Sequence, residues 1–221
     1  MTEEADVKES ISISWSELTR WREECYRRFG SIRDLPLHAP YKKLQELLQS
    51  DSCVLDVGAG VHKSFSKYLT LSTQSYFSLD NDPAGDFDFR SFRDILADQE
   101  FDLIVANQVL EHLTIDDAFA MLRSAYRYQV ADGYLLATVP NAAHPVRQWG
   151  DPTHLTAWSM NDLYSLVRNA GYYVISMFRY NKRPLTWNPI KRMVVNIVCE
   201  TFRVDWCDSL MILGQKRTQD A

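Results

Sequence analysis

Short apolar runs alternate with amphipathic stretches along most of this chain. Four runs of five or six mostly apolar residues lie at 53–57 (CVLDV), 75–79 (SYFSL), 101–106 (FDLIVA) and 134–139 (YLLATV). Runs of this kind are typical of strands that are covered on both faces. Between the last two, from about 114 to 130, apolar residues recur at helical spacing. This alternation predicts an α/β fold with a doubly wound, mostly parallel sheet.

The first part of the chain predicts helices rather than strands. A capping box at Ser14–Glu17 begins a helix that Gly30 ends, and a second short helix is expected over about Pro40–Gln49. We expect residues 1–50 to be an N-terminal helical cover that belongs to the same domain as residues 51–221.

The last part of the chain departs from strict strand–helix alternation. Ser159 caps an expected helix that Gly171 stops, and a strand follows at 172–180 (YYVISMFRY). A further helix near 190–202 precedes a final strand at 209–216 (SLMILGQK). Two late strands joined by a long connection predict an antiparallel edge strand on the parallel sheet.

Composition and charge narrow the classes of protein that fit. The chain has 221 residues, a net charge of −5 and a pI near 5.5, which argues against a nucleic-acid binder. No apolar run reaches the length of a membrane span, and the acidic first ten residues lack a signal-peptide core. A cytoplasmic location is therefore expected. The four cysteines are scattered without zinc spacing and are expected to be reduced thiols.

The strongest chemical signal is VLDVGAG, in which an apolar strand runs directly into the turn Gly58-Ala59-Gly60. Glycines let the backbone turn tightly and approach a ligand closely, at the edge of the sheet where α/β folds bind nucleotides. A helix from about His62 to Leu69 is expected to follow. Taken alone, the same pattern also fits a plain strand–helix turn.

An acidic residue at the end of the second strand strengthens the nucleotide hypothesis. Asp80 lies 24 residues after Asp56, and its carboxylate is placed to accept hydrogen bonds from both hydroxyls of a ribose. Asp80 also opens Asp-Asn-Asp-Pro, which is good turn chemistry. The two interpretations are compatible.

The details of the turn favour one cofactor over another. The third glycine of a dinucleotide site is missing after Gly60, which counts against an NAD-dependent oxidoreductase. Asp56 within the motif is unfavourable beside phosphates but suits a cofactor that carries an ammonium group. S-adenosylmethionine has ribose, adenine, ammonium and sulfonium groups and no phosphate, so these residues favour it.

These motifs together resemble the class I S-adenosylmethionine-dependent methyltransferases of the type 11 and type 23 groups, over about residues 50–180. LDNDP resembles their acidic second-strand end, FDLIVANQVLEHL their fourth strand and GYLLATVPN their fifth. The resemblance implies a Rossmann-like fold and adds Asn81 and Asn107 to the cofactor-binding residues. The chain departs from the pattern at His62, where many relatives carry glycine. It also lacks a clear adenine-binding aspartate after the third strand, for which Asp88 is the substitute.

The segment GDPTHLTAWS, residues 150–159, resembles methyltransferases of bacterial glycan and lipopolysaccharide pathways. The resemblance implies methyl transfer to a hydroxyl of a sugar, a glycan or a related small molecule. An N- or C-methyltransferase of a secondary metabolite and a methyltransferase-like protein that binds without catalysis remain alternatives. The acceptor, its regiochemistry and the oligomeric state stay open.

Two histidines are the candidate catalytic residues, because a hydroxyl acceptor benefits from a base that works near neutral pH. His154 and His112 are expected near the methyl group, and each could instead be a structural residue. Trp149 and Trp158 could supply a stacking surface for a sugar ring. Glu111 is expected to orient its loop, and no metal is expected because no spacing of histidines and carboxylates demands one.

A cluster of four cations borders the expected helix near 190–202, namely Lys182, Arg183, Lys191 and Arg192. One interpretation is a peripheral contact with an anionic lipid surface or a lipid-linked substrate. We favour the other, in which the apolar face of the helix packs on the sheet edge and the cations are solvated.

Overall fold

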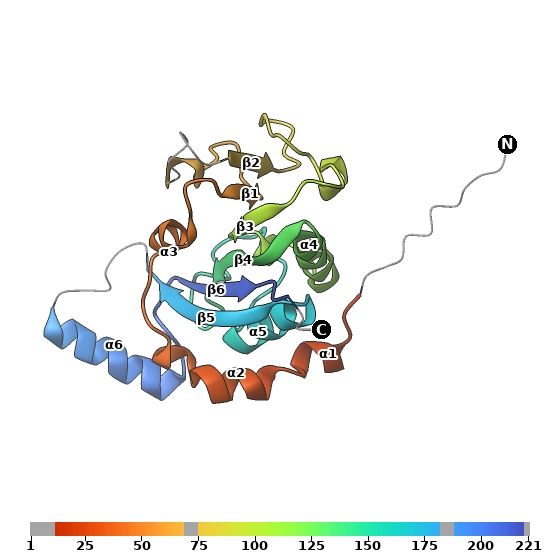
Figure 1. Ribbon diagram of the computed structural model, residues 1–221. Coiled ribbons are helices and arrows are strands. Elements are labelled where there is room, and N and C mark those ends of the chain that lie inside the picture. Colours follow the sequence, from red (N-terminus) through yellow and green to blue (C-terminus); the bar gives the residue numbers. More distant parts are fainter. Residues whose placement is uncertain (1–11, 69–74, 182–187, 219–221) are drawn as a thin grey trace.

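The computed structural model describes residues 12–68, 75–181 and 188–218. Within these ranges the chain forms a six-stranded sheet in the order β2-β1-β3-β4-β6-β5 (Figure 1). The strands are β1 (Cys53–Val57), β2 (Ser75–Leu79), β3 (Phe101–Asn107), β4 (Gln129–Pro140), β5 (Tyr173–Tyr180) and β6 (Ser209–Gln215).

The predicted fold class is confirmed. Strands β2, β1, β3 and β4 pair in parallel, whereas β6 runs antiparallel to both of its neighbours, β4 and β5. The antiparallel pairing therefore lies at one edge of the sheet, with β6 one place inside that edge. A backbone segment near Leu37 bridges to Arg179 on the outer side of β5 and covers part of the open edge.

Helices cover both faces of the sheet. They are α1 (Trp15–Thr19), α2 (Arg22–Phe29), α3 (Pro40–Leu47), α4 (Ile115–Arg127), α5 (Met160–Asn169) and α6 (Pro189–Phe202). Figure 1 shows α4 and α5 on one side of the sheet and α3 on the other. The larger apolar core includes Leu122 of α4 and Leu163 of α5, and the smaller one includes Leu44 of α3. Two separate cores are what a doubly wound sheet requires.

The N-terminal helices pack on α5 rather than on the sheet itself. The indole of Trp21 donates a hydrogen bond to Asn169 of α5 over 3.0 Å, and the side-chain amide of Asn169 donates to the Glu17 carbonyl over 2.7 Å. Leu18 and Cys25 join the larger core. The division of the chain at residues 50 and 51 stays a prediction.

Local structure differs from the prediction in two places. The single N-terminal helix is broken into α1 and α2 at Arg20 and Trp21, although the Ser14 capping box forms. Only a short 3-10 turn (Ser66–Tyr68) forms in the described part of the helix expected from His62, and the predicted end at Leu69 lies outside the described residues. Between β2 and β3, residues 86–94 make one parallel bridge, from Phe89 to Leu79.

Helix α6 does not pack on the sheet edge, so the interpretation that we favoured from the sequence is wrong. Figure 1 shows α6 standing off the sheet. Its one fully buried residue is Cys199. More than half of each of five apolar side chains is exposed, namely Ile190, Met193, Val194, Ile197 and Phe202. Lys182 and Arg183 lie outside the described residues, and no described helix is long and apolar enough to cross a bilayer.

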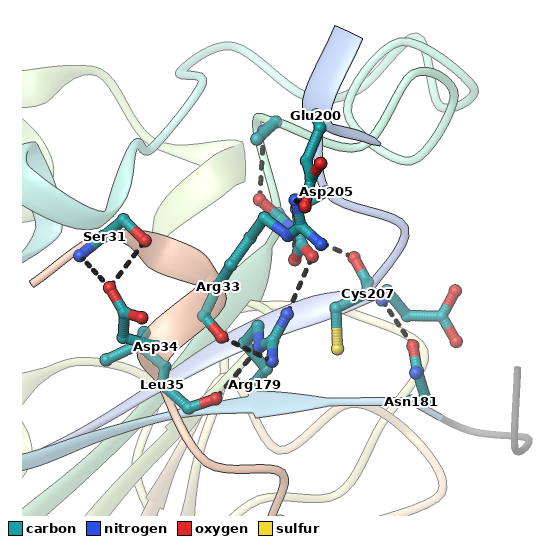
Figure 2. Close-up of polar contacts among 12 residues, drawn as sticks. Ser31, Arg33, Asp34, Leu35, Arg179, Asn181, Glu200, Asp205 and Cys207 are labelled. Carbon is teal, nitrogen blue, oxygen red and sulfur yellow. Dashed lines mark hydrogen bonds and ion pairs between the residues drawn. The ribbon is translucent and has the colours of Figure 1, made fainter. Parts of the chain in front are cut away.

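A half-buried arginine, Arg179, joins the N-terminal segment to the end of the sheet (Figure 2). The Arg179 guanidinium donates hydrogen bonds to the carbonyls of Leu35 (3.0 Å) and Arg33 (2.9 Å) and pairs with the Asp205 carboxylate at 2.9 Å. The other oxygen of Asp205, which is buried, accepts from the Asn141 amide over 2.8 Å. Arg179 therefore both neutralises a buried charge and fixes the chain that precedes α3.

Replacing Arg179 by methionine should lower the free energy of unfolding by about 3 kcal/mol, because the buried Asp205 carboxylate loses its counter-charge. The matched control is Arg22→Met, which breaks the half-exposed Arg22–Asp162 pair and should cost less than about 1 kcal/mol. Urea unfolding of both variants measures the difference. Equal losses would contradict a special role for Arg179.

Candidate functional site

Three predicted cofactor residues follow strands that end at the same level. In the parallel register Val57 pairs with Leu79 of β2 and with Ala106 of β3. The next residues along the three strands are Gly58, Asp80 and Asn107. Strand pairing therefore places them side by side at the carboxyl edge of the sheet, where α/β folds bind ligands.

The glycine turn has the backbone geometry that the motif predicts. Gly58 has φ +67°, and a Cβ there would lie 2.4 Å from Val109 Cγ2, so no larger residue fits. Gly60 has φ +62° and borders open space. The Gly60 amide donates a hydrogen bond to Asp80 Oδ2 over 2.8 Å. The turn and Asp80 thus form one unit.

Asp80 also stabilises the Asp-Asn-Asp-Pro turn, as its sequence predicts. Its other oxygen, Oδ1, accepts from the Asp82 amide over 3.0 Å. Each carboxylate oxygen has further acceptor capacity, and the side chain is half-buried rather than enclosed. Its two backbone bonds hold the carboxylate in place, so a ligand would find it already oriented.

Asp56 lies behind the turn and not on its surface. Its side chain is 2% exposed, and Oδ2 accepts a hydrogen bond from the Tyr76 hydroxyl over 2.7 Å. Burial raises the pKa of this carboxyl to about 6, which the Tyr76 bond partly offsets and the Asp80 charge reinforces. This placement makes Asp56 a support for the turn and gives it little surface for a cofactor ammonium group.

The remaining cofactor candidates differ in whether their side chains already make hydrogen bonds within the protein. Asn81 is exposed, and Asn107 accepts a hydrogen bond from the Thr138 hydroxyl over 2.7 Å. Asp88 accepts from both the amide and the hydroxyl of Ser78, at 2.8 and 2.6 Å. Asp88 Oδ2 therefore fastens the segment around residues 86–94 to Ser78 of β2, and the other carboxylate oxygen, Oδ1, is left for a ligand.

The two candidate histidines come together because one loop docks on another. The Glu111 carbonyl accepts hydrogen bonds from the amides of Leu155 (2.7 Å) and Thr156 (3.1 Å), and the Thr156 hydroxyl donates to the Leu113 carbonyl. These bonds bring the 151–156 loop against the turn after β3. The imidazole centres of His112 and His154 lie 5.0 Å apart.

Hydrogen bonds define which nitrogen holds the proton when each imidazole is neutral. His154 Nδ1 lies 2.9 Å from the Gln148 carbonyl, which only accepts, so Nδ1 carries a proton. His112 Nδ1 faces the Thr153 carbonyl at 3.2 Å and the Thr153 hydroxyl at 3.0 Å, and that hydroxyl donates its own proton to Asp151. In the neutral form of each ring Nε2 is therefore the unprotonated nitrogen, and Nε2 of His154 lies 3.8 Å from Asp151 Oδ2.

Glu111 is the unusual group of this region. Its side chain is fully buried, and neither carboxylate oxygen has a hydrogen-bond partner among the described residues. Burial raises the pKa of Glu111 to about 8; the residue's own backbone amide opposes the shift, and the nearby Asp151 charge adds to it. One carboxylate oxygen of Glu111 and one ring nitrogen each of His112 and His154 lie within 4.8 Å of one another.

A cavity of about 430 Å³ lies beside the two histidines. Most of the residues that line it have polar side chains. They come from the turn after β3, the end of β4, the 146–154 region and the start of β6, and are Gln108, Glu111, His112, Pro140, Val146, Arg147, Gly150, Asp151, His154, Asp208 and Ser209. Gln108, Arg147, Asp208 and Ser209 were not among the residues predicted from the sequence. Gln108 lies three residues before Glu111 in the same predicted turn, whereas nothing local marks the other three.

The prediction that Trp158 stacks on a sugar ring is wrong. Its side chain is 1% exposed, and the indole donates a hydrogen bond to the Leu110 carbonyl over 3.0 Å. Trp158 is instead an anchor for the loop that carries His154. Trp149 is largely exposed, and its role stays a prediction.

Comparison with known proteins identifies the class to which this fold and site belong. A family model described as a methyltransferase domain matches residues 27–177. The chain belongs to this family and is an S-adenosylmethionine-dependent methyltransferase. No curated protein gives a significant sequence match.

Solved structures agree on the fold. An S-adenosylmethionine-dependent methyltransferase from Archaeoglobus fulgidus is 16% identical, with a TM-score of 0.61, and the match covers 91% of this chain and 97% of that one. One from Methanosarcina mazei is 14% identical, with a TM-score of 0.57 and coverages of 84% and 100%. One from Mesorhizobium loti is 10% identical, with a TM-score of 0.53 and coverages of 80% and 98%.

The buried Asp56 should make stability depend on pH. Its pKa is higher in the folded chain than the ordinary value near 4, so wild type should lose stability relative to Asp56→Asn as pH rises from about 4 to 6. Between about pH 4 and neutral pH, the free energy of unfolding of Asp56→Asn should rise by about 3 kcal/mol relative to that of wild type. Asparagine keeps an acceptor for the Tyr76 hydroxyl. Urea unfolding across this range measures the gain, and a difference that does not change with pH would contradict it.

Proposed function

We propose that this methyltransferase transfers the methyl group of S-adenosylmethionine to a hydroxyl of a sugar, a glycan or a related small molecule. The observation that carries the proposal is the pair of adjacent imidazoles, His112 and His154, beside a cavity that several polar side chains line. Those side chains suit an acceptor with several hydroxyl groups. A neutral imidazole whose Nδ1 holds the ring proton presents Nε2 for the removal of a hydroxyl proton.

The cofactor half of the proposal rests on the glycine turn and the strand ends beside it. We assign cofactor contact to six residues, namely Gly58, Ala59, Gly60, Asp80, Asn81 and Asn107. The positive φ of both glycines and the preoriented Asp80 carboxylate support this assignment. Asp56 would act from behind the turn. S-adenosylmethionine supplies a methyl group on a positively charged sulfur, which is a good leaving group.

His154 is the proposed base. In the transfer step its Nε2 takes the proton of the acceptor hydroxyl while the oxygen forms a bond to the methyl carbon. The carbon–sulfur bond breaks, and its electron pair stays on the sulfur. Holding the oxygen, carbon and sulfur in line would supply much of the rate. His112 is the second candidate for this role, because its imidazole lies next to that of His154.

A nitrogen or carbon acceptor on a secondary metabolite remains the alternative, since the cofactor half would be the same. A panel of sugars, glycans, amines and phenolic metabolites separates the two. The four cysteines are free thiols, which suits the cytoplasmic location expected from the sequence. The exposed apolar side chains of α6 beside Lys191 and Arg192 support a peripheral lipid contact, which stays a prediction.

Replacing Asp80 by alanine should weaken binding of the demethylated cofactor by roughly 1–3 kcal/mol, because two ribose hydroxyls lose a charged acceptor. Isothermal titration calorimetry measures the change, with the exposed neighbour variant Asp86→Ala as control. Wild type should bind S-adenosylmethionine and not NAD. An unchanged dissociation constant in Asp80→Ala would place the ribose elsewhere.

Replacing His154 by alanine should lower turnover by ~10²-fold or more while cofactor affinity stays nearly intact. A purely structural histidine would instead lower the melting temperature and raise the acceptor Michaelis constant, with little change in turnover at saturation. Turnover, Michaelis constant and melting temperature of this variant therefore separate the two roles. Normal turnover in a stably folded His154→Ala protein would refute the base assignment and leave His112.

A further inference from the structure

The unpartnered carboxylate of Glu111 calls for an explanation. Burying a carboxylate without hydrogen-bond donors is costly, and buried polar groups in proteins are nearly always satisfied. Glu111 has no exposed surface, and neither of its oxygens is hydrogen-bonded within the described part of the chain. Other elements of the turn have their partners, including the Glu111 backbone carbonyl. The missing hydrogen bonds of Glu111 are therefore those of its side chain alone.

The described side chains beside this carboxylate give it no hydrogen bond. In its neutral form each imidazole holds its proton on Nδ1, where a carbonyl group accepts it, so Nε2 of each ring is an acceptor. One carboxylate oxygen of Glu111 and one ring nitrogen each of His112 and His154 lie within 4.8 Å of one another. A positive charge among these atoms would stabilise the arrangement. A proton serves two of the three groups at a time, whereas a metal cation serves all three.

We propose that Glu111, His112 and His154 form the binding site of one divalent transition-metal cation. The proposal deepens the proposed function, because the site opens on the same cavity. The binding itself does not depend on which acceptor is methylated.

The surroundings of the histidines match those of known metal ligands. Metal-binding imidazoles usually donate their other ring N–H to a carbonyl or carboxylate, which fixes the ring and its tautomer. His154 does so to the Gln148 carbonyl and His112 to Thr153. Ligand atoms around such a cation lie roughly 3–4 Å apart. The three ligand atoms, which all lie within 4.8 Å of one another, are close to that spacing.

The ligand set selects the kind of cation. Two imidazoles and one carboxylate suit Zn²⁺ or Fe²⁺, whereas Mg²⁺ and Ca²⁺ prefer oxygen ligands. Three protein ligands also leave coordination positions open. Because all three residues line the 430 Å³ cavity, an acceptor hydroxyl entering that cavity could take an open position.

A cation here changes how the hydroxyl is activated. A metal-bound hydroxyl loses its proton more easily than a free one, so its proton would pass to solvent, and the oxygen would then form its bond to the methyl carbon. The carbon–sulfur electron pair again stays on the sulfur. With a cation bound, the role proposed above for His154 Nε2 would pass to the cation and solvent, and His112 and His154 would hold the cation.

Calorimetric titration of the chelator-treated, tag-free full chain with ZnCl₂ tests the site. We expect one Zn²⁺ per chain, with MgCl₂ at least a hundredfold weaker. Glu111→Gln and His112→Ala should each weaken Zn²⁺ binding at least tenfold. The matched control is His62→Ala, which removes an exposed histidine outside this cavity and should bind Zn²⁺ as wild type does.

Thermal unfolding shows that a loss of binding is not a loss of fold. Glutamine has nearly the shape of glutamate without its charge, so metal-free Glu111→Gln should melt at or above the temperature of metal-free wild type. Zn²⁺ should raise the melting temperature of wild type and leave that of the variant unchanged.

The proposal is overturned if wild type binds no Zn²⁺, or if Glu111→Gln binds it as tightly as wild type. These results are separate from a failure of the proposed function. Stoichiometric Zn²⁺ binding without methylation of any hydroxyl acceptor would support the cation site and contradict the proposed acceptor class. Hydroxyl methylation by a protein that binds no Zn²⁺ would support the acceptor class and contradict the cation site.

Discussion

The parallel register of three central strands is the constraint on which the site depends. Because β1 is hydrogen-bonded to β2 on one side and β3 on the other, Val57, Leu79 and Ala106 lie level. The chain must leave all three strands at the same edge of the sheet. The glycine turn, Asp80 and the Glu111 turn are consequences of that shared edge. A shift of one residue in this register would turn each strand over and separate them.

The second half of the site is attached to this edge by backbone hydrogen bonds. The Glu111 carbonyl holds the 151–156 loop, and the buried Trp158 indole fastens the end of the same loop to the Leu110 carbonyl. The loop thereby carries His154 against His112. Backbone carbonyl groups hold the loop in place, so this attachment uses neither imidazole Nε2 atom.

Asp56 and Glu111 are buried acids whose ionised forms are destabilised by their surroundings. Asp56 beneath the glycine turn has one hydroxyl donor, whereas Glu111 has no donor among the described residues. Burial raises the pKa of both carboxyl groups. Arg179 shows the opposite solution, since its guanidinium neutralises the buried Asp205. Glu111 has no such partner among the described residues and lies in a cavity beside two imidazoles, and the proposed cation site rests on this difference.

The sequence by itself determined the α/β class, the glycine turn and the strand-end Asp80, because strand periodicity, glycine placement and turn chemistry are encoded over a few neighbouring residues. It could not show that α6 stands off the sheet or that Trp158 is buried, since both depend on which surfaces pack together. The sequence placed His112 and His154 at one site, but only the tertiary structure showed that the buried Glu111 side chain lies beside both and how the loop of His154 is held there. Their meeting depends on hydrogen bonds between two distant backbone segments, and a backbone carbonyl leaves no signature in the residue types that a sequence records.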